Sequence, residues 1–192
     1  MKFDPTKEAA IELAQEAVKR GASAAEVIIR KRTEFAVGVR LGEVEKLKQS
    51  TDQGLGLRVL IEGRQASVSG SDFSRSAVLG LLDEAIELAR ATSPDDSLYL
   101  PEPAEFARSI PDLDLYDEAI EALTTEEKIE MAVRAERAAQ DYSDSIINFD
   151  GGGLDSSSGT IILANSLGFA GEYSATSLSL AAVPVATDGV RM

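Results

Sequence analysis

Residues 35–41 read Phe-Ala-Val-Gly-Val-Arg-Leu, and this stretch decides the class of fold. Every second residue in it is large and apolar: Phe35, Val37, Val39 and Leu41. A period of two is typical of a β-strand that buries one face. Residues 55–61 repeat the alternation, with Leu55, Leu57, Val59 and Ile61 on one face. The stretch therefore predicts a sheet with one face against a core.

Further strands are expected on both sides of this pair. Residues 25–32 precede it, and Glu62-Gly63 forms a tight-turn candidate before a short strand at 65–69. The link between 25–32 and 35–41 is too short for a crossover helix, so antiparallel pairing is expected. Three more strand candidates follow later: 145–150, 160–165 and 169–185, with a hairpin turn at 165–168.

Three helices are expected between and before these strands. Asp4 is a candidate cap and Gly21 a candidate stop for the first helix. The second runs from about Ser74 to Ala91. The third is opened by a capping box of Thr124 and Glu127, and it runs to about Tyr142. A segment from 93 to 123 with four prolines is predicted to be an unusually long loop.

The expected order is α-β-β-β-β-α-α-β-β-β. Runs of strands and runs of helices predict an α+β fold, with an antiparallel or mixed sheet and about three helices packed on one face. One domain is expected over residues 1–192.

Composition excludes several kinds of chemistry. The 192 residues include no His and no Cys. Without Cys there is no disulfide, thiolate zinc site or cysteine nucleophile, and without His the commonest general base and transition-metal ligand are missing. A metal held by this chain alone would need carboxylate and carbonyl oxygens.

The charge balance bears on partners and location. With 33 acidic and 19 basic side chains, the formal charge is −14, which disfavours nucleic acid or an anionic membrane as a direct partner. No secretory signal and no apolar run of membrane-spanning length is visible, so a cytoplasmic location is expected.

Two glycine-rich segments resemble ligand-binding loops. Residues 151–153, Gly-Gly-Gly, are compatible with a phosphate cradle, but no Lys follows and no helix starts there. A flexible turn is the preferred interpretation. Gly54-Leu55-Gly56 resembles part of a dinucleotide fingerprint but opens a strand, so a dinucleotide site is not predicted.

Polar side chains give no catalytic constellation either. The serine run 156–158 beside Asp155 is interpreted as a polar turn, because no His completes a relay. A Ser–Lys pair with Lys128, the last lysine, stays open in principle. The carboxylates at 112, 114 and 117 lack calcium-loop spacing and are interpreted as a solvated loop. No catalytic, cofactor-binding or metal-ligating residue is therefore predicted in this chain.

An ordered series of short segments resembles the TldD/PmbA family, whose members are also called modulators of DNA gyrase. The segments lie at 21–27, 42–45, 54–59, 85–90, 92–95, 111–116, 151–152 and 165–168. The pattern is nearest to the PmbA (TldE) branch and covers nearly the whole chain. The resemblance is to the N-terminal domain of the family, whose members continue into a β-rich C-terminal domain that this sequence lacks.

The resemblance implies a function. By this resemblance, the expected context is that of TldD and PmbA proteins, paired subunits of a cytoplasmic zinc-dependent peptidase that trims extended peptides. In the family the TldD-type subunit carries a His-Glu-x-x-x-His helix that binds zinc, and no such motif occurs here. We therefore expect a non-catalytic domain that needs no cofactor of its own. Its expected partners are a zinc-bearing TldD-like subunit or a second copy of itself, and an extended peptide.

Two alternatives stay open from the sequence. One is an acidic interaction module that modulates a DNA-handling enzyme such as gyrase. The other is a hydrolase that uses carboxylates alone, since a catalytic pair of Asp or Glu is recognised only in three dimensions.

Overall fold

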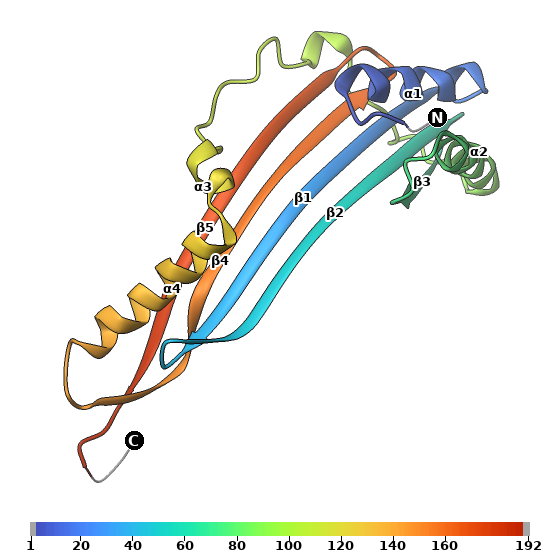
Figure 1. The fold of residues 1–192 in the computed structure, drawn as a ribbon. Helices are drawn as coiled ribbons and strands as arrows, with labels where there is room; N and C mark the ends of the chain where they lie inside the picture. Colours follow the sequence, from blue (N-terminus) through green and yellow to red (C-terminus); the bar gives the residue numbers. More distant parts are fainter. Residues whose placement is uncertain (1–2, 190–192) are drawn as a thin grey trace. The chain divides into compact units, whose positions relative to one another are not determined.

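A computed structural model describes residues 3–189. It shows an α+β protein with a five-stranded antiparallel sheet, in the strand order β3-β2-β1-β4-β5 (Figure 1). The strands are β1 (Ala24–Arg40), β2 (Glu43–Ile61), β3 (Arg64–Gly70), β4 (Ile146–Asn165) and β5 (Ala170–Ala186). The helices are α1 (Lys7–Lys19), α2 (Arg75–Ala91), α3 (Glu118–Ala122) and α4 (Thr125–Gln140), with a 3-10 turn at Pro103–Glu105. The expected fold class is confirmed.

The strands are longer than the sequence pattern indicated. The expected strands at 25–32 and 35–41 form one strand, β1, which ends one residue before Leu41, so the antiparallel pairing expected between them is wrong. The expected strands at 145–150 and 160–165 likewise form one strand, β4, which begins one residue after Ser145. The stretch at 43–49, which has no alternation, is the first part of β2, and all of its residues are exposed. A strand exposed on both faces carries no period of two, so the pattern had no signal there.

Tight turns join the strands where the sequence predicted them. Glu62 and Gly63 both take positive φ, at 48° and 73°, in the turn between β2 and β3. Two positive φ angles define the type I′ turn, whose twist matches that of a hairpin. At 165–168 the Asn165 Oδ1 atom accepts hydrogen bonds from the backbone N–H groups of Leu167 and Phe169, each at 3.0 Å. Both predicted hairpin turns are confirmed.

The chain divides into two compact units. Unit 1 comprises residues 1–31, 52–113 and 160–174, and unit 2 comprises 32–51, 114–159 and 175–192. The expectation of one domain, and of a missing C-terminal domain, stays a prediction.

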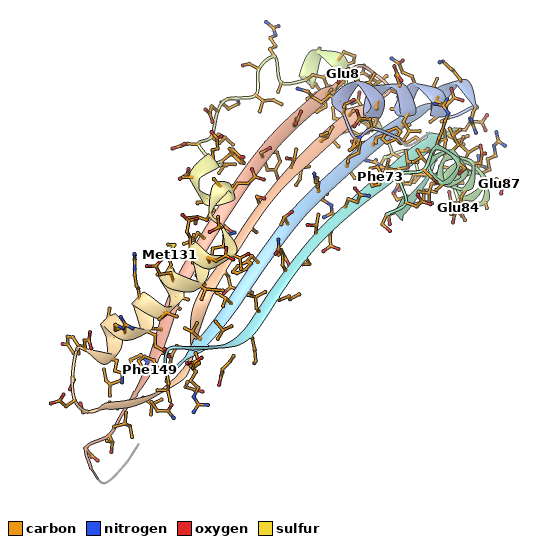
Figure 2. The ribbon with its side chains drawn as sticks, viewed as in Figure 1. Glu8, Phe73, Glu84, Glu87, Met131 and Phe149 are labelled. Carbon is orange, nitrogen blue, oxygen red and sulfur yellow. The ribbon has the colours of Figure 1, made fainter. Side chains whose placement is uncertain are left out.

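Unit 1 has a core built by two helices on the sheet. Alanines and Leu13 on α1, and Val78, Leu82 and Ile86 on α2, are buried together with Leu57 and neighbouring strand residues. Side chains on the opposite side of α2, such as Glu84 and Glu87, are exposed and point away from this core (Figure 2). The cap of α1 is the hydroxyl of Thr6, which accepts from the Ala9 N–H, and not the predicted Asp4. Ser74 caps α2 as the predicted start implied.

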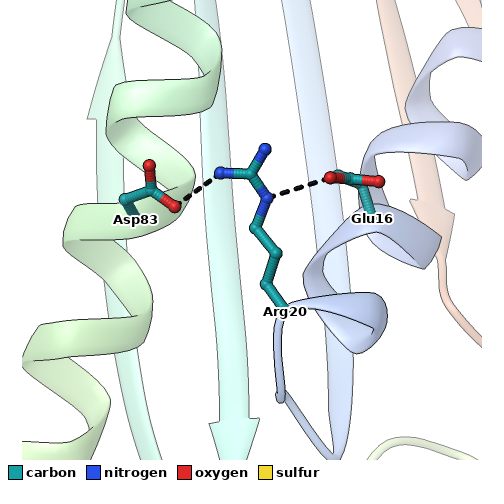
Figure 3. A network of polar contacts seen from close by, with 3 residues as sticks. All are labelled: Glu16, Arg20 and Asp83. Carbon is teal, nitrogen blue, oxygen red and sulfur yellow. Dashed lines mark hydrogen bonds and ion pairs between the residues drawn. The ribbon is translucent and has the colours of Figure 1, made fainter.

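One arginine links the two helices of unit 1. The Arg20 guanidinium donates to Glu16 Oε1 at 2.9 Å and to Asp83 Oδ1 at 2.6 Å (Figure 3). Its hydrogen bonds with Asp83 and Glu16 raise the pKa of Arg20 above its usual value. Since Glu16 lies four residues before Arg20 and Asp83 lies on α2, the side chain ties the end of α1 to its neighbour.

Unit 2 has its own smaller core under α4. Phe35, Val37 and Val39 of β1 and Leu154 of β4 are buried with Ala132 of α4. Met131, on the same helix, packs partly buried against this cluster (Figure 2). The alternation at 35–39 thus faces the core as predicted.

The long segment after α2 is irregular over most of its length, as predicted, but it contains the 3-10 turn and α3. Near its end the Leu115 carbonyl accepts from the Thr176 N–H at 2.9 Å, and the Asp117 N–H donates to Thr176 Oγ1 at 2.9 Å. This part of the segment therefore lies along β5. Among residues 3–189, no helix has the length and apolar character needed to cross a membrane.

The predicted capping box opens α4. Thr124 Oγ1 accepts from the Glu127 N–H at 3.2 Å, and Glu127 Oε2 accepts from the Thr124 N–H at 2.8 Å. The hydrogen bonds from the Thr124 backbone and hydroxyl lower the pKa of Glu127 below its usual value. A carboxyl whose pKa is lower in the folded state stabilises that state above its unfolded pKa, and this contribution is lost as pH falls through the folded value.

We therefore expect Glu127→Gln, which keeps an acceptor but loses the charge, to melt below the parent protein at about pH 7. The difference in melting temperature should shrink as pH falls below the unfolded carboxyl pKa of about 4.3. Thermal melts followed by circular dichroism over a pH series measure this. Glu130→Gln, on the exposed side of α4, is the matched control. A difference between Glu127→Gln and the parent that is the same at every pH would contradict the assignment.

Candidate functional site

The glycine run at 151–153 lies inside β4 and is not the flexible turn that the sequence suggested. Gly151 takes a positive φ of 82°. A Cβ atom on Gly153 would lie 1.9 Å from the Val37 carbonyl oxygen, and one on Gly152 would lie 3.2 Å from the Ala181 carbonyl oxygen. The run therefore lets β1 and β5 approach β4 closely. Gly152 and Gly153 thus serve strand packing, and no helix N-terminus follows the run to bind a phosphate.

The glycines at 54 and 56 lie within β2, where the sequence placed a strand. A Cβ atom on Gly56 would lie 2.8 Å from Ile28 Cγ2. This close packing accounts for the glycine without a dinucleotide.

The serine run also lies within β4, so the predicted polar turn is wrong. Ser156 is buried at 7% exposure beside Leu154, while Asp155 is exposed. Ser157 shares a hydroxyl–hydroxyl hydrogen bond of 2.9 Å with Ser177 of β5. The Ser158 hydroxyl donates to Glu121 Oε1 of α3 at 3.2 Å. The strand continues through the run, and the three serine side chains lie on the faces of the sheet.

These serines and Lys128 line one cavity, which we call the α4 cavity. It has a volume of about 240 Å³ and lies at the start of α4. Its lining includes Phe35, Glu121, Thr125, Lys128, Ser156 and Ser158. From the sequence, a pair formed by one of these serines and Lys128 was open only in principle, because they lie about thirty residues apart and on different elements. The fold brings both to the same space within unit 2.

The arrangement is not a Ser–Lys nucleophile. The Lys128 ammonium lies over the Phe35 ring, 4.9 Å from its centroid. Among residues 3–189, no hydrogen bond joins Lys128 to a serine, so the geometry for proton transfer from a hydroxyl is not built here. What the cavity offers instead is a cation and several hydroxyl groups around a small volume.

The three carboxylates at 112, 114 and 117 do not form a metal site with one another. The Asp117 side chain accepts from the Ala119 N–H at 2.8 Å and so caps α3. Within the described part of the chain, no three Asp or Glu side chains gather as metal ligands. Together with the absence of His and Cys from the sequence, this donor set does not fit the zinc ion that the resemblance implies for the family.

One carboxylate that sequence reasoning did not single out is central to unit 2. Glu136 of α4 is 2% exposed, and its two oxygens accept from the Leu41 N–H at 2.8 Å and the Gly42 N–H at 2.6 Å. Leu41 and Gly42 form the turn between β1 and β2, with φ of 52° and 79°. The signal in the sequence was a Glu four residues after Ala132, on the buried face of the helix. Its two backbone partners, however, are remote in sequence.

Two family models match the chain. Residues 25–89 match domain 1 of the PmbA/TldA metallopeptidases, and residues 118–192 match the central domain of the same proteins. The Metalloprotease PmbA of Escherichia coli O157:H7 is 34% identical over 181 residues, which cover 94% of this chain.

The chain belongs to the PmbA/TldD family.

A second relative, the Metalloprotease PmbA homolog of Haemophilus influenzae, is 32% identical over 171 residues and 89% of this chain. The two alignments span only 40% and 38% of the relatives' own lengths. The relatives carry the PmbA name, which agrees with the branch expected from the sequence. The PmbA/TldD family thus contains longer proteins, of which this chain matches two of the domains.

Solved structures agree with the fold. A candidate modulator of DNA gyrase from Bacteroides thetaiotaomicron superposes with a TM-score of 0.85 at 26% identity, covering 98% of this chain and 43% of that one. TldE from Thermococcus kodakarensis superposes with a TM-score of 0.80 at 16% identity, covering 94% of this chain and 40% of that one. At 16% identity the second likeness supports the fold alone.

Proposed function

We propose that this PmbA/TldD family chain is a non-catalytic part of a PmbA/TldE-like subunit in a cytoplasmic metallopeptidase complex that processes extended peptides. The observation that carries the proposal is the donor set. The relatives are named metalloproteases, yet none of the 192 residues is a His or a Cys. The zinc of such a complex would therefore be bound by a TldD-like partner subunit, or by residues outside this sequence.

The role proposed for this chain is to shape the space in which a peptide is held. Its sheet has two edge strands, β3 and β5, and edge strands can pair with an extended backbone. Part of β5 is already paired with residues 115–117, as described above. The charge of −14 favours peptides and protein partners over nucleic acid or an anionic membrane.

Peptide hydrolysis tests this function. The chain, a partner that carries a His-Glu-x-x-x-His motif, and the two mixed are each assayed with an unfolded peptide, and bound zinc is measured by mass spectrometry. We expect no zinc and no cleavage for the chain alone, and faster cleavage by the mixture than by the partner alone. A partner with both motif histidines replaced is the control for contaminating peptidases. Peptide cleavage by the isolated chain, with zinc bound to it, would refute the proposal.

A second candidate function rests on the Bacteroides likeness. That protein is described as a candidate modulator of DNA gyrase, and at 26% identity it covers nearly the whole chain. An acidic domain can compete with DNA for a basic surface by long-range electrostatics. Titration of the chain against gyrase in a salt series tests this alternative, since such binding must weaken steeply with salt. Absence of salt-sensitive binding would exclude it.

A further inference from the structure

Ser156 shows that the α4 cavity has an unused hydrogen-bonding group. Ser156 is only 7% exposed, and its hydroxyl has no hydrogen-bond partner among residues 3–189. Yet in the described part of the chain no fully buried side-chain oxygen or nitrogen lacks a partner. The Ser156 oxygen must therefore reach open space. Ser156 lines both the α4 cavity and a second hollow that includes Asp155 and Ser157. Side chains two residues apart share a strand face, so the Ser156 side chain lies on the face of Leu154, which packs into the core under α4, and its hydroxyl opens toward the α4 cavity.

A cation without a carboxylate partner lines the same cavity. The Lys128 ammonium lies over the Phe35 ring, and no described Asp or Glu lies within ion-pairing distance of it. Thr125, the first residue of α4, also lines the cavity. The first turn of this helix is occupied by its capping box and carries the carboxylates of Glu126 and Glu127, so the positive charge of the cavity comes from Lys128. A buried hydroxyl donor and an ammonium therefore line one volume.

Glu121 limits the charge that the cavity can accept. Its two oxygens accept hydrogen bonds from the Tyr116 and Ser158 hydroxyls, which hold the carboxylate in place at the cavity wall. Among the described residues of the lining, Lys128 is a cation without an ion-pair partner and Glu121 is a fixed anion, so a doubly charged phosphate is disfavoured and a singly charged group is preferred. Ile120, Leu123 and Phe35 add apolar surface. At about 30 Å³ per water molecule, a volume of 240 Å³ corresponds to roughly eight water molecules. This is roughly the space that one amino-acid residue needs.

We propose that the α4 cavity binds the carboxylate group of a peptide C-terminus whose last side chain is apolar. The Lys128 ammonium pairs with the carboxylate, the Ser156 hydroxyl donates to it, and the apolar wall receives the side chain. The choice of a peptide as the source of the carboxylate rests on the proposed function. Binding itself requires neither zinc nor a partner subunit, so it can fail while partner-dependent cleavage succeeds, and the reverse also holds.

Nuclear magnetic resonance titration of the ¹⁵N-labelled chain tests the proposal. The probes are N-acetyl-Ala-Leu with a free carboxylate, the same dipeptide as its C-terminal amide, and acetate. We expect the acid to shift the amide signals of residues 125 and 156–158, and the amide to bind at least about tenfold more weakly because it cannot form the charge-assisted contacts. Weaker binding of acetate than of the acid dipeptide supports a peptide end as the ligand. Equal binding of acetate and the acid dipeptide would overturn the assignment to a peptide end and leave a site for small free acids.

Four variants and a control separate the contributions. Lys128→Met keeps the apolar stem over Phe35 and should weaken binding of the acid about tenfold, while Lys128→Arg should restore most of it. Ser156→Ala should weaken binding about threefold to tenfold. Glu121→Gln should strengthen it about threefold, because it removes a like charge.

Lys46→Met, an exposed lysine on β2 in the same unit, should change nothing. Equal affinity for the acid and the amide, binding of neither, or unchanged affinity in Lys128→Met would overturn the proposal. The opposite signs expected for Lys128→Met and Glu121→Gln keep the test informative even if one variant loses stability.

Discussion

Gly153→Ala is expected to destabilise unit 2 by about 3 kcal/mol or more, the upper range for overpacking a close contact. The added Cβ atom would lie 1.9 Å from the Val37 carbonyl oxygen, 2.9 Å from the Val37 carbonyl carbon and 3.1 Å from Gly38 Cα. All three are backbone atoms of β1, so no side chain can rotate away. The strands must separate, and their ladder hydrogen bonds are lost with them.

Urea unfolding followed by far-ultraviolet circular dichroism measures the effect, since the chain has no Trp. Gly151→Ala is the matched control: it lies two residues away, also has a positive φ, but has nothing within 4 Å of the added Cβ atom. It should cost about 1 kcal/mol from backbone strain alone. Gly80→Ala in α2 also meets open space and should stabilise by up to about 1 kcal/mol. Equal midpoints for the variants at 151 and 153 would show that the close approach is absent.

Glu136→Ala is expected to cost about 2–3 kcal/mol, because hydrogen bonds to a charged group contribute about 1.5–3 kcal/mol. The variant removes both acceptors of the Leu41 and Gly42 N–H groups and leaves a cavity under α4. The turn between β1 and β2 then loses its link to the helix. Protection of the Leu41 and Gly42 amides against hydrogen exchange should fall more than that of the other amides in unit 2.

Glu136→Gln separates charge from shape. It keeps the volume and one carbonyl acceptor, and so should recover roughly half of the lost stability. Glu130→Ala, on the exposed side of the same helix, should stay within about 0.5 kcal/mol of the parent. If Glu136→Ala lowered the stability as little as Glu130→Ala, water would be accepting the hydrogen bonds of the Leu41 and Gly42 N–H groups as well as the carboxylate does.

Local patterns in the sequence predicted local structure well. The alternation at 35–41 and 55–61, the capping box at Thr124 and the turn at Glu62-Gly63 all depend on neighbours within a few residues. Strand lengths were underestimated where the signal disappears: residues 43–49 are exposed, and the glycine and serine runs of β4 resemble turns by composition. In β4, sheet pairing outweighs the turn propensity of these residues, because the neighbouring strands β1 and β5 provide hydrogen-bond partners for the backbone on both sides.

The glycine run illustrates why composition was misleading. A glycine is favoured in a turn for its freedom at positive φ, but it is equally required where two backbones approach closely. Gly153 is of the second kind, and its contact, Val37, lies on another strand. No window of sequence around residue 153 contains that information.

Composition alone established which side chains this family member can offer, because a chain without imidazole or thiol has only oxygen ligands for a metal ion, wherever its residues lie in space. Folding established which groups meet. Lys128 and Ser156 line one cavity, and Glu136 reaches the turn at Leu41, because α4 packs across strands that are distant in sequence. The physical reason is that side-chain periodicity extends over one element, whereas a binding site is formed by contacts between elements.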